Sequence, residues 1–178
     1  SAIVGGPAGI GKTWAFEEAF RVNKIKFRTP RVSSPQALIE ELYERPNGTF
    51  LFDECDTMLR DVALLNILKV ATDSKLGPRM LEWKTRREES TIPPFEFTGK
   101  IVFLLNTDLN KAAKGKLGPH ISALMDRCEP FVMTFDHFAI WEYTCYLACA
   151  ERMLMREQIS RDITNQALRF FTETMWRR

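Results

Sequence analysis

The segment from Gly6 to Thr13 constrains this chain more than any other. It reads Gly-Pro-Ala-Gly-Ile-Gly-Lys-Thr, which fits the phosphate-binding-loop pattern of a glycine, four residues and then Gly-Lys-Thr. Loops of this kind turn consecutive backbone N–H groups toward a phosphate, and the helix that follows presents its positive end to the same anion. Residues 2–4 predict a buried strand before the loop, and residues 14–22 predict a helix after it. The segment therefore predicts that the chain binds a nucleoside triphosphate.

Two side chains of the loop have expected tasks at the phosphates. Lys12 reaches the β- and γ-phosphates as a positive charge, and Thr13 offers its hydroxyl to Mg²⁺. We expect contacts with the nucleotide along the whole loop, from Gly6, Pro7, Ala8, Gly9, Ile10, Gly11, Lys12 and Thr13.

Composition and patterning place the chain among α/β proteins. Its 178 residues are 45% hydrophobic and 27% charged, which suits one domain with a small appendage. Apolar strand patterns alternate with helical patterns, so we expect a parallel sheet with helices on its faces. No apolar run approaches the length of about 20 residues that a membrane span needs, and no signal peptide is visible, so we expect a cytoplasmic protein without membrane contact. The four cysteines form no CxxC pair, and the net charge of +2 does not indicate a nucleic-acid partner by itself.

The expected elements follow from periodicity and from turn residues. The strands are expected at residues 24–28, 49–52, 100–105 and 131–135, and the helices at residues 35–44, 61–74, 119–127, 138–156 and 162–176. Residues 77–99 interrupt this alternation, because Met80–Trp83 and Phe95–Phe97 alternate as half-buried strands do. We expect a β-hairpin here, with a long charged tip inserted just before the strand at residues 100–105.

A second motif distinguishes hydrolysis from simple binding. The apolar residues 50–52 predict a buried strand that ends in Asp53 and Glu54. Asp53 is placed to hold Mg²⁺ through water, and Glu54 to orient or deprotonate an attacking water. The alternative is that Glu54 and Asp56 only form an acidic, solvated loop.

Two further residues complete the series. Asn106 follows the strand at residues 100–105 and would lie beside the γ-phosphate if that strand neighbours those ending at Gly5 and Asp53. Arg127 precedes the strand expected at residues 131–135, where it either pairs with Asp126 or Glu129 on the surface or reaches the γ-phosphate of a neighbouring subunit.

Together these motifs resemble those of AAA+ ATPases, in that family's order. Walker A, Walker B, sensor 1 and the arginine finger correspond to Gly6–Thr13, Phe50–Glu54, Leu104–Asn106 and Ala123–Arg127. The resemblance implies a three-layer αβα P-loop core with a parallel five-stranded sheet over residues 1–136, and a partial helical lid over residues 137–178. It also implies ATP and Mg²⁺ as cofactors, hydrolysis at subunit interfaces of a homo-oligomeric ring that is commonly a hexamer, and Arg127 acting on the neighbouring subunit. One motif departs from the pattern, because no clear sensor-2 arginine is present and Arg169 is the one candidate.

The segment around Leu68–Asn106, with its hairpin, is similar to phage-encoded AAA+ ATPases and, more distantly, to superfamily-three viral helicases. In those helicases the hairpin lines the pore of the ring and grips single-stranded nucleic acid. Basic residues support contact with nucleic acid at two places, with Lys84, Arg86 and Arg87 at the hairpin tip and Lys111, Lys114 and Lys116 on a loop after Asn106. The alternative is a solvated charged loop, since Glu88 and Glu89 follow directly.

The chain is accordingly expected to be an ATP-driven motor that acts on single- or double-stranded nucleic acid, in replication, packaging or a related phage-like process in the host cytoplasm. The alternative is an ATPase that remodels or assembles proteins, although the basic segment at residues 28–34 lacks the aromatic loop expected of a protein unfoldase. A small-molecule P-loop kinase fits less well, because Asp53, Glu54 and Asn106 together serve attack by water.

Overall fold

The computed structural model describes residues 1–73, 77–83, 92–116, 118–133, 137–149 and 159–175. The chain divides into two compact units, Ser1–Met133 and Thr134–Arg178. In the first unit a five-stranded sheet has the order β2-β3-β6-β1-β7, and each neighbouring pair is parallel. Its strands are β1 (Ala2–Gly5), β2 (Phe27–Arg28), β3 (Thr49–Phe52), β6 (Lys100–Leu105) and β7 (Glu129–Val132).

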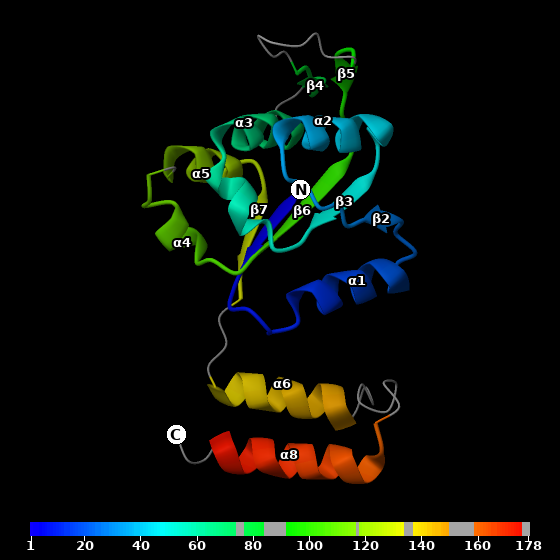
Figure 1. Cartoon of the computed structure of the whole chain (residues 1–178), viewed down its shortest axis with the longest axis vertical. Coiled ribbons are helices and arrows are strands. Elements are labelled where there is room, and N and C mark those ends of the chain that lie inside the picture. The colour runs from blue at the N-terminus through cyan, green and yellow to red at the C-terminus, as the bar shows by residue number, and fades with distance from the viewer. Residues whose placement is uncertain (74–76, 84–91, 117, 134–136, 150–158, 176–178) are drawn as a thin grey trace. The chain divides into compact units, whose positions relative to one another are not determined.

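Helices connect these strands, as parallel pairing requires. They are α1 (Lys12–Val22), α2 (Pro35–Glu44), the 3₁₀ helix η1 (Cys55–Arg60), α3 (Val62–Ala71), α4 (Leu109–Ala112) and α5 (Gly118–Met125). Figure 1 shows α2 and α3 on one side of the sheet and α1 on the other. This arrangement is compatible with the predicted three-layer αβα fold.

Alternation along the strands divides the core between the two faces of the sheet. Phe50, Phe52 and Phe103 pack with the apolar residues of α2, α3 and α5 in one buried cluster. Leu51 and Leu104 point the other way and pack with Phe20 of α1 in a second cluster. Since all these strand residues are buried, the central strands are apolar on both faces, as in other covered parallel sheets.

Most expected elements of this unit are confirmed, and some bounds are wrong. The bounds of α2, β3 and β6 agree with the prediction residue for residue. The last strand does not run over residues 131–135 but begins at Glu129, which pairs with Ala2. As an edge strand, β7 tolerates the exposed Glu129 and Pro130, which do not fit the pattern of an apolar run. The helix expected at residues 61–74 ends at Ala71, where the Thr72 hydroxyl donates to the carbonyl of Leu68 at 2.8 Å.

The predicted hairpin pairing is present. The strand β4 (Met80–Leu81) pairs antiparallel with β5 (Phe95–Glu96), with Leu81 opposite Phe95. These strands are shorter than expected, and Trp83 packs against the core cluster instead of continuing β4. The tip residues 84–91, which include the predicted basic positions, lie outside the described residues.

The second unit is described by two helices, α6 (His137–Cys149) and α8 (Arg161–Met175). They contact each other, and the indole N–H of Trp141 donates to the hydroxyl of Thr172 at 3.2 Å. Within the described ranges no helix combines the length and the apolar character that crossing a membrane requires.

The backbone just after the hairpin approaches the turn that precedes β3. The N–H groups of Thr98 and Gly99 both donate to the carbonyl of Pro46, at 2.7 and 2.8 Å. The guanidinium of Arg79 donates to the carbonyls of Ala71 and Gly99 and lies 5.2 Å from the ring centre of Phe97. These contacts leave Gly99 no room for a side chain.

We expect Gly99→Ala to destabilise the first unit. A Cβ at this position would lie 2.4 Å from the carbonyl oxygen of Gly48 and 2.6 Å from the ring of Phe97. Such overpacking costs about 1–3 kcal/mol, which lowers Tm by about 2–4 °C per kcal/mol in a protein of this size. Gly115→Ala is the control, because its nearest contact would be a carbonyl oxygen at 3.3 Å. Equal Tm values for the two variants would contradict the prediction.

Candidate functional site

The loop between β1 and α1 has the geometry that anion binding needs. Gly9 and Gly11 adopt the left-handed conformation, with φ of 78° and 82°, which side chains disfavour. Within the described part of the chain, no acceptor takes a hydrogen bond from the N–H groups of Ala8, Gly9 or Ile10. Gly11 precedes the first turn of α1, so the free N–H groups of a helix N-terminus lie next to those of the loop. These donors fit a phosphate group.

Lys12 lies inside this loop, and only 6% of its surface is exposed. Its ammonium group donates to the carbonyls of Gly6 at 2.9 Å and Pro7 at 2.7 Å, and to the side-chain oxygen of Asn106 at 2.9 Å. Desolvation lowers the pKa of Lys12, and the carboxylates of Asp53 and Asp56 oppose this shift. Lys12 is thus a buried cation that the protein holds at the centre of the site.

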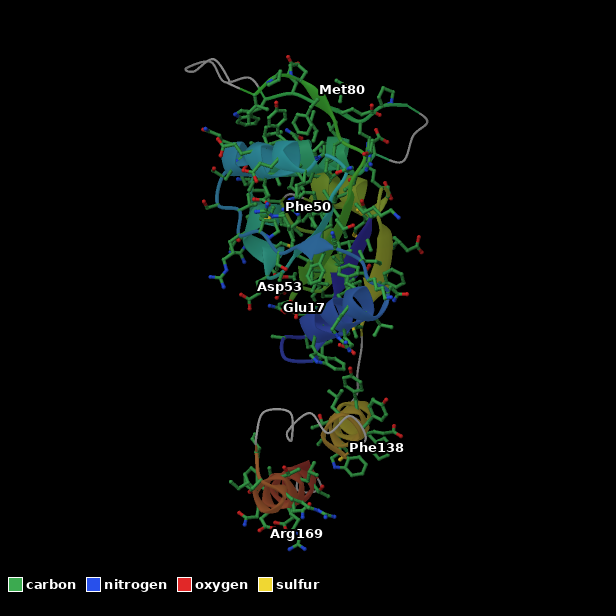
Figure 2. The ribbon with its side chains drawn as sticks, turned by 90° about the vertical axis from the view of Figure 1, so that its right-hand side faces the viewer. Glu17, Phe50, Asp53, Met80, Phe138 and Arg169 are labelled. Atoms are coloured by element: carbon green, nitrogen blue, oxygen red, sulfur yellow. The ribbon has the colours of Figure 1, made fainter. Side chains whose placement is uncertain are left out.

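Thr13, in the first turn of α1, contacts Asp53, which follows β3. The Thr13 hydroxyl donates to a carboxylate oxygen of Asp53 at 2.9 Å. Figure 2 shows Asp53 at the margin of the first unit, whereas Phe50 on the preceding strand β3 lies within it. A hydroxyl and a carboxylate are the oxygen donors that Mg²⁺ takes in nucleotide sites. The described residues contain no group of three or more His, Cys, Asp or Glu that could hold a metal alone, so an ion here would need oxygens from water and phosphates as well.

Glu54 has a left-handed backbone conformation and an exposed side chain. Its φ is 49°, in the left-handed region where a non-glycine residue costs about 1–2 kcal/mol. It is the N-cap of η1, yet its side chain makes no capping hydrogen bond. The carboxylate is exposed and lines a cavity of about 410 Å³ with Asp53, Thr29 and Arg31. Backbone strain at a residue whose side chain is free is characteristic of functional sites.

The strand order brings Asn106 to these residues. Because β6 lies between β3 and β1, Asn106 at its carboxyl end lies between the loop that follows Gly5 and the turn that begins with Asp53. The strand that ends at Asn106 therefore neighbours those that end at Gly5 and Asp53, as the prediction for Asn106 required. The contact between Asn106 and Lys12 shows that the two side chains share one site.

Sequence reasoning missed a second set of contacts at this edge. The sequence presents Asp56 only as part of an acidic, solvated loop, but its carboxylate accepts hydrogen bonds from the Asn106 N–H at 3.0 Å and from the Thr107 hydroxyl. The neighbouring Cys55 donates its S–H to the carbonyl of Leu104 at 3.4 Å, and burial raises the pKa of this thiol. The sequence does show Asp56 as a third acidic residue close after Asp53 and Glu54. It does not show that the partners of Asp56 are Asn106 and Thr107.

Arg127 lies apart from this site. It follows α5 and precedes β7, and since β7 begins opposite Ala2 in a parallel pair, Arg127 is at the amino ends of the strands. Its guanidinium donates to the carbonyl of Ala123 at 2.6 Å, and its Nε has no hydrogen-bond partner among the described residues. The structure therefore does not bring Arg127 together with Lys12 in the same chain.

The predicted nucleic-acid residues fall into two groups. Lys84, Arg86 and Arg87 lie outside the described residues. Lys111, Lys114 and Lys116 are exposed, and they do not share one loop as expected, because Lys111 belongs to α4 and the other two follow it. Asp108 caps α4 by accepting from two backbone N–H groups, which explains a helix directly after the Asn106 turn.

Two other arginines belong to segments that the sequence analysis singled out, Arg169 as the sensor-2 candidate and Arg28 in the basic segment 28–34. Arg169, the candidate for sensor 2, is exposed on α8 in the second unit. Arg28 forms ion pairs with Glu41 at 2.7 Å and Glu44 at 3.4 Å, so its positive charge is paired with carboxylates of α2.

The chain is similar to part of a bacteriophage protein. An uncharacterized 36.7 kDa protein in the nrdC-mobD intergenic region of Enterobacteria phage T4 is 33% identical over 140 residues. The match covers 71% of this chain and 42% of the phage protein, so the chain spans about two fifths of that relative's length. No protein-family model matches the sequence.

Proposed function

We propose that the chain is a Mg²⁺-dependent ATP hydrolase of the AAA+ type, built on a P-loop core. The observation that carries the proposal is the pair of contacts from the loop, Lys12 to Asn106 and Thr13 to Asp53, at the carboxyl ends of adjacent parallel strands. Ligands of open α/β sheets bind at this edge. The sequence motif and the geometry of the loop point to the same phosphate-binding chemistry.

The residues divide the work between binding and hydrolysis. The N–H groups of the loop and the Lys12 ammonium hold the β- and γ-phosphates. When a phosphate is bound, one of its oxygens accepts from Lys12 in place of a loop carbonyl. Thr13 and Asp53 would hold Mg²⁺, which would supply positive charge beside the phosphates. Glu54, whose exposed carboxylate has no hydrogen bond or ion pair with another described residue, orients or deprotonates the attacking water, and Asn106 holds that water from the other side.

Glu54→Gln is expected to separate these two activities. The amide keeps the size of the side chain but loses the base, so hydrolysis should fall by about 10²–10⁴-fold. Binding of ATP, measured with a fluorescent analogue, should stay within a few-fold of the wild-type affinity. Lys12→Ala is the matched control and should weaken binding itself. Wild-type turnover in Glu54→Gln would show that another group is the base, and absence of Mg²⁺-dependent ATP hydrolysis by the wild-type chain would overturn the proposed function.

We further propose that the site is completed by a second copy of the chain in a ring. Arg127 is half-buried at the opposite ends of the strands from its own Lys12, and its Nε lacks a partner among the described residues. A head-to-tail ring places opposite ends of neighbouring subunits in contact. An arginine supplied in this way stabilises charge on the transferring phosphate and contributes about 10³–10⁵ in turnover.

Mixing two inactive variants tests this arrangement. Arg127→Ala lacks the arginine but keeps Glu54, whereas Glu54→Gln lacks the base but keeps Arg127. A mixture should recover part of the ATPase activity at interfaces that combine an intact Glu54 with a partner's intact Arg127. Arg45→Ala, at another arginine of the same unit, should retain activity alone and serves as the control. If light scattering shows assembled mixtures without any recovery, Arg127 does not act between subunits.

The substrate that the motor acts on is proposed to be nucleic acid. Lys111, Lys114 and Lys116 are exposed directly after the Asn106 turn, and none forms an ion pair with another described residue. Unpaired lysines close to a hydrolytic site can couple phosphate-backbone contacts to turnover. The relative is a bacteriophage protein, which supports a phage-like process in the host cytoplasm. A ring that remodels proteins is the alternative, and the cavity beside Thr29 and Arg31 is where its substrate would reach Glu54.

Single-stranded DNA is expected to stimulate the ATPase of the wild-type chain. Replacing Lys84, Arg86 and Arg87 together by alanine should abolish the stimulation and reduce the slope of log affinity against log salt, by about 0.7 for each phosphate that the variant no longer neutralises. A second triple variant at Lys111, Lys114 and Lys116 tests the other cluster. Replacing Lys24, Lys26 and Arg21, which are exposed at the end of α1, removes equal charge and should leave the stimulation unchanged. Absence of stimulation and of salt-dependent binding would favour the protein-remodelling alternative.

A further inference from the structure

We infer that Asp56 is a positioning residue for hydrolysis, which acts by holding Asn106 and, through Asn106, the Lys12 ammonium. The inference deepens the proposed ATP hydrolysis and rests on it. Asp56 lies on η1, three positions after Asp53, and is half-buried at the edge where the site lies.

The contacts of Asp56 join two turns that are distant in the sequence. One carboxylate oxygen accepts from the backbone N–H of Asn106 at 3.0 Å, and the other accepts from the hydroxyl of Thr107. Both oxygens thus bind consecutive residues of the turn after β6. Hydrogen bonds to an ionised carboxylate are about twice as strong as those between neutral groups, so this pair fixes the turn firmly.

The fixed turn determines where the Asn106 side chain can reach. Its Oδ1 accepts from the Lys12 ammonium at 2.9 Å, so a continuous chain of hydrogen bonds runs from Asp56 through Asn106 to Lys12. Cys55 ties the same turn of η1 to the end of β6, since its S–H donates to the carbonyl of Leu104. Two adjacent residues of η1 therefore hold the end of β6 in register with Asp53 and Glu54.

Asp108 offers a matched control two residues beyond Asn106. It too accepts two hydrogen bonds with its carboxylate, from the N–H groups of Asn110 and Lys111, and it caps α4. Losing such a cap costs about 1 kcal/mol of stability. These bonds hold a helix and do not reach Lys12, so a purely structural carboxylate should behave as Asp108 does.

The experiment compares Asp56→Ala, Asp56→Asn, Thr107→Val and Asp108→Ala in the full chain. For each, kcat and KM for Mg·ATP are measured together with Tm and with amide hydrogen exchange at Asn106. Asp56→Ala should lower kcat by about 10–100-fold, as loss of an outer-shell partner does, with KM changed less than threefold and faster exchange at Asn106. Asp56→Asn keeps an acceptor for the Asn106 N–H and should restore the slow exchange and part of kcat. Thr107→Val, which removes one of the two hydrogen bonds, should lie between Asp56→Ala and the wild type.

Asp108→Ala should lower Tm while its kcat and the exchange at Asn106 stay close to wild-type values. The inference is overturned if Asp56→Ala matches Asp108→Ala in kcat and in exchange. It is also overturned if Asp56→Ala acts on KM alone, or if exchange at Asn106 is unchanged when kcat falls. A wild-type chain that protects the Asn106 amide but hydrolyses no ATP would overturn the proposed function and, with it, the catalytic use of Asp56.

Discussion

The parallel register of three strands is the constraint on which the site depends. Gly5 of β1 pairs with Leu105 of β6, and Phe52 of β3 pairs with Phe103. This register places the residues that leave the strands, Gly6, Asp53 and Asn106, at one edge of the sheet. Buried side chains on both faces of these strands hold the register, because a shift by one residue would exchange the inward-facing phenylalanines with the residues that face α1.

Left-handed backbone conformations occur at two of the places where the chain leaves this sheet. The loop before α1 uses glycines at Gly9 and Gly11, for which the left-handed conformation costs little. Glu54 adopts the same region without being a glycine, although a glycine there would remove the strain. The left-handed backbone at this carboxylate therefore costs stability, as strained residues at functional sites do. The buried Cys55 and the bonds of Asp56 hold the turn against that strain.

The main elements, and the positions of Asp53 and Asn106 at strand ends, could be predicted from the sequence because they depend on local patterns. Apolar runs of four to six residues gave the bounds of β3 and β6, and the proline at position 35 with Ser34 as cap gave α2. The edge strand β7 was misplaced because its half-exposed residues lack that pattern. The contacts of Asp56 could not be predicted, since they join residues 50 positions apart that only the strand order brings together.

The same strand order connects the phosphate-binding-type loop to the ends of two other strands. A binding loop needs the N–H groups and Lys12, and these lie between β1 and α1. Here the Lys12 ammonium also contacts Asn106 at the end of β6, and Thr13 contacts Asp53 at the end of β3. In the proposed ATP hydrolase, those contacts would connect a phosphate at the loop with the turn that carries Glu54 and Asp56.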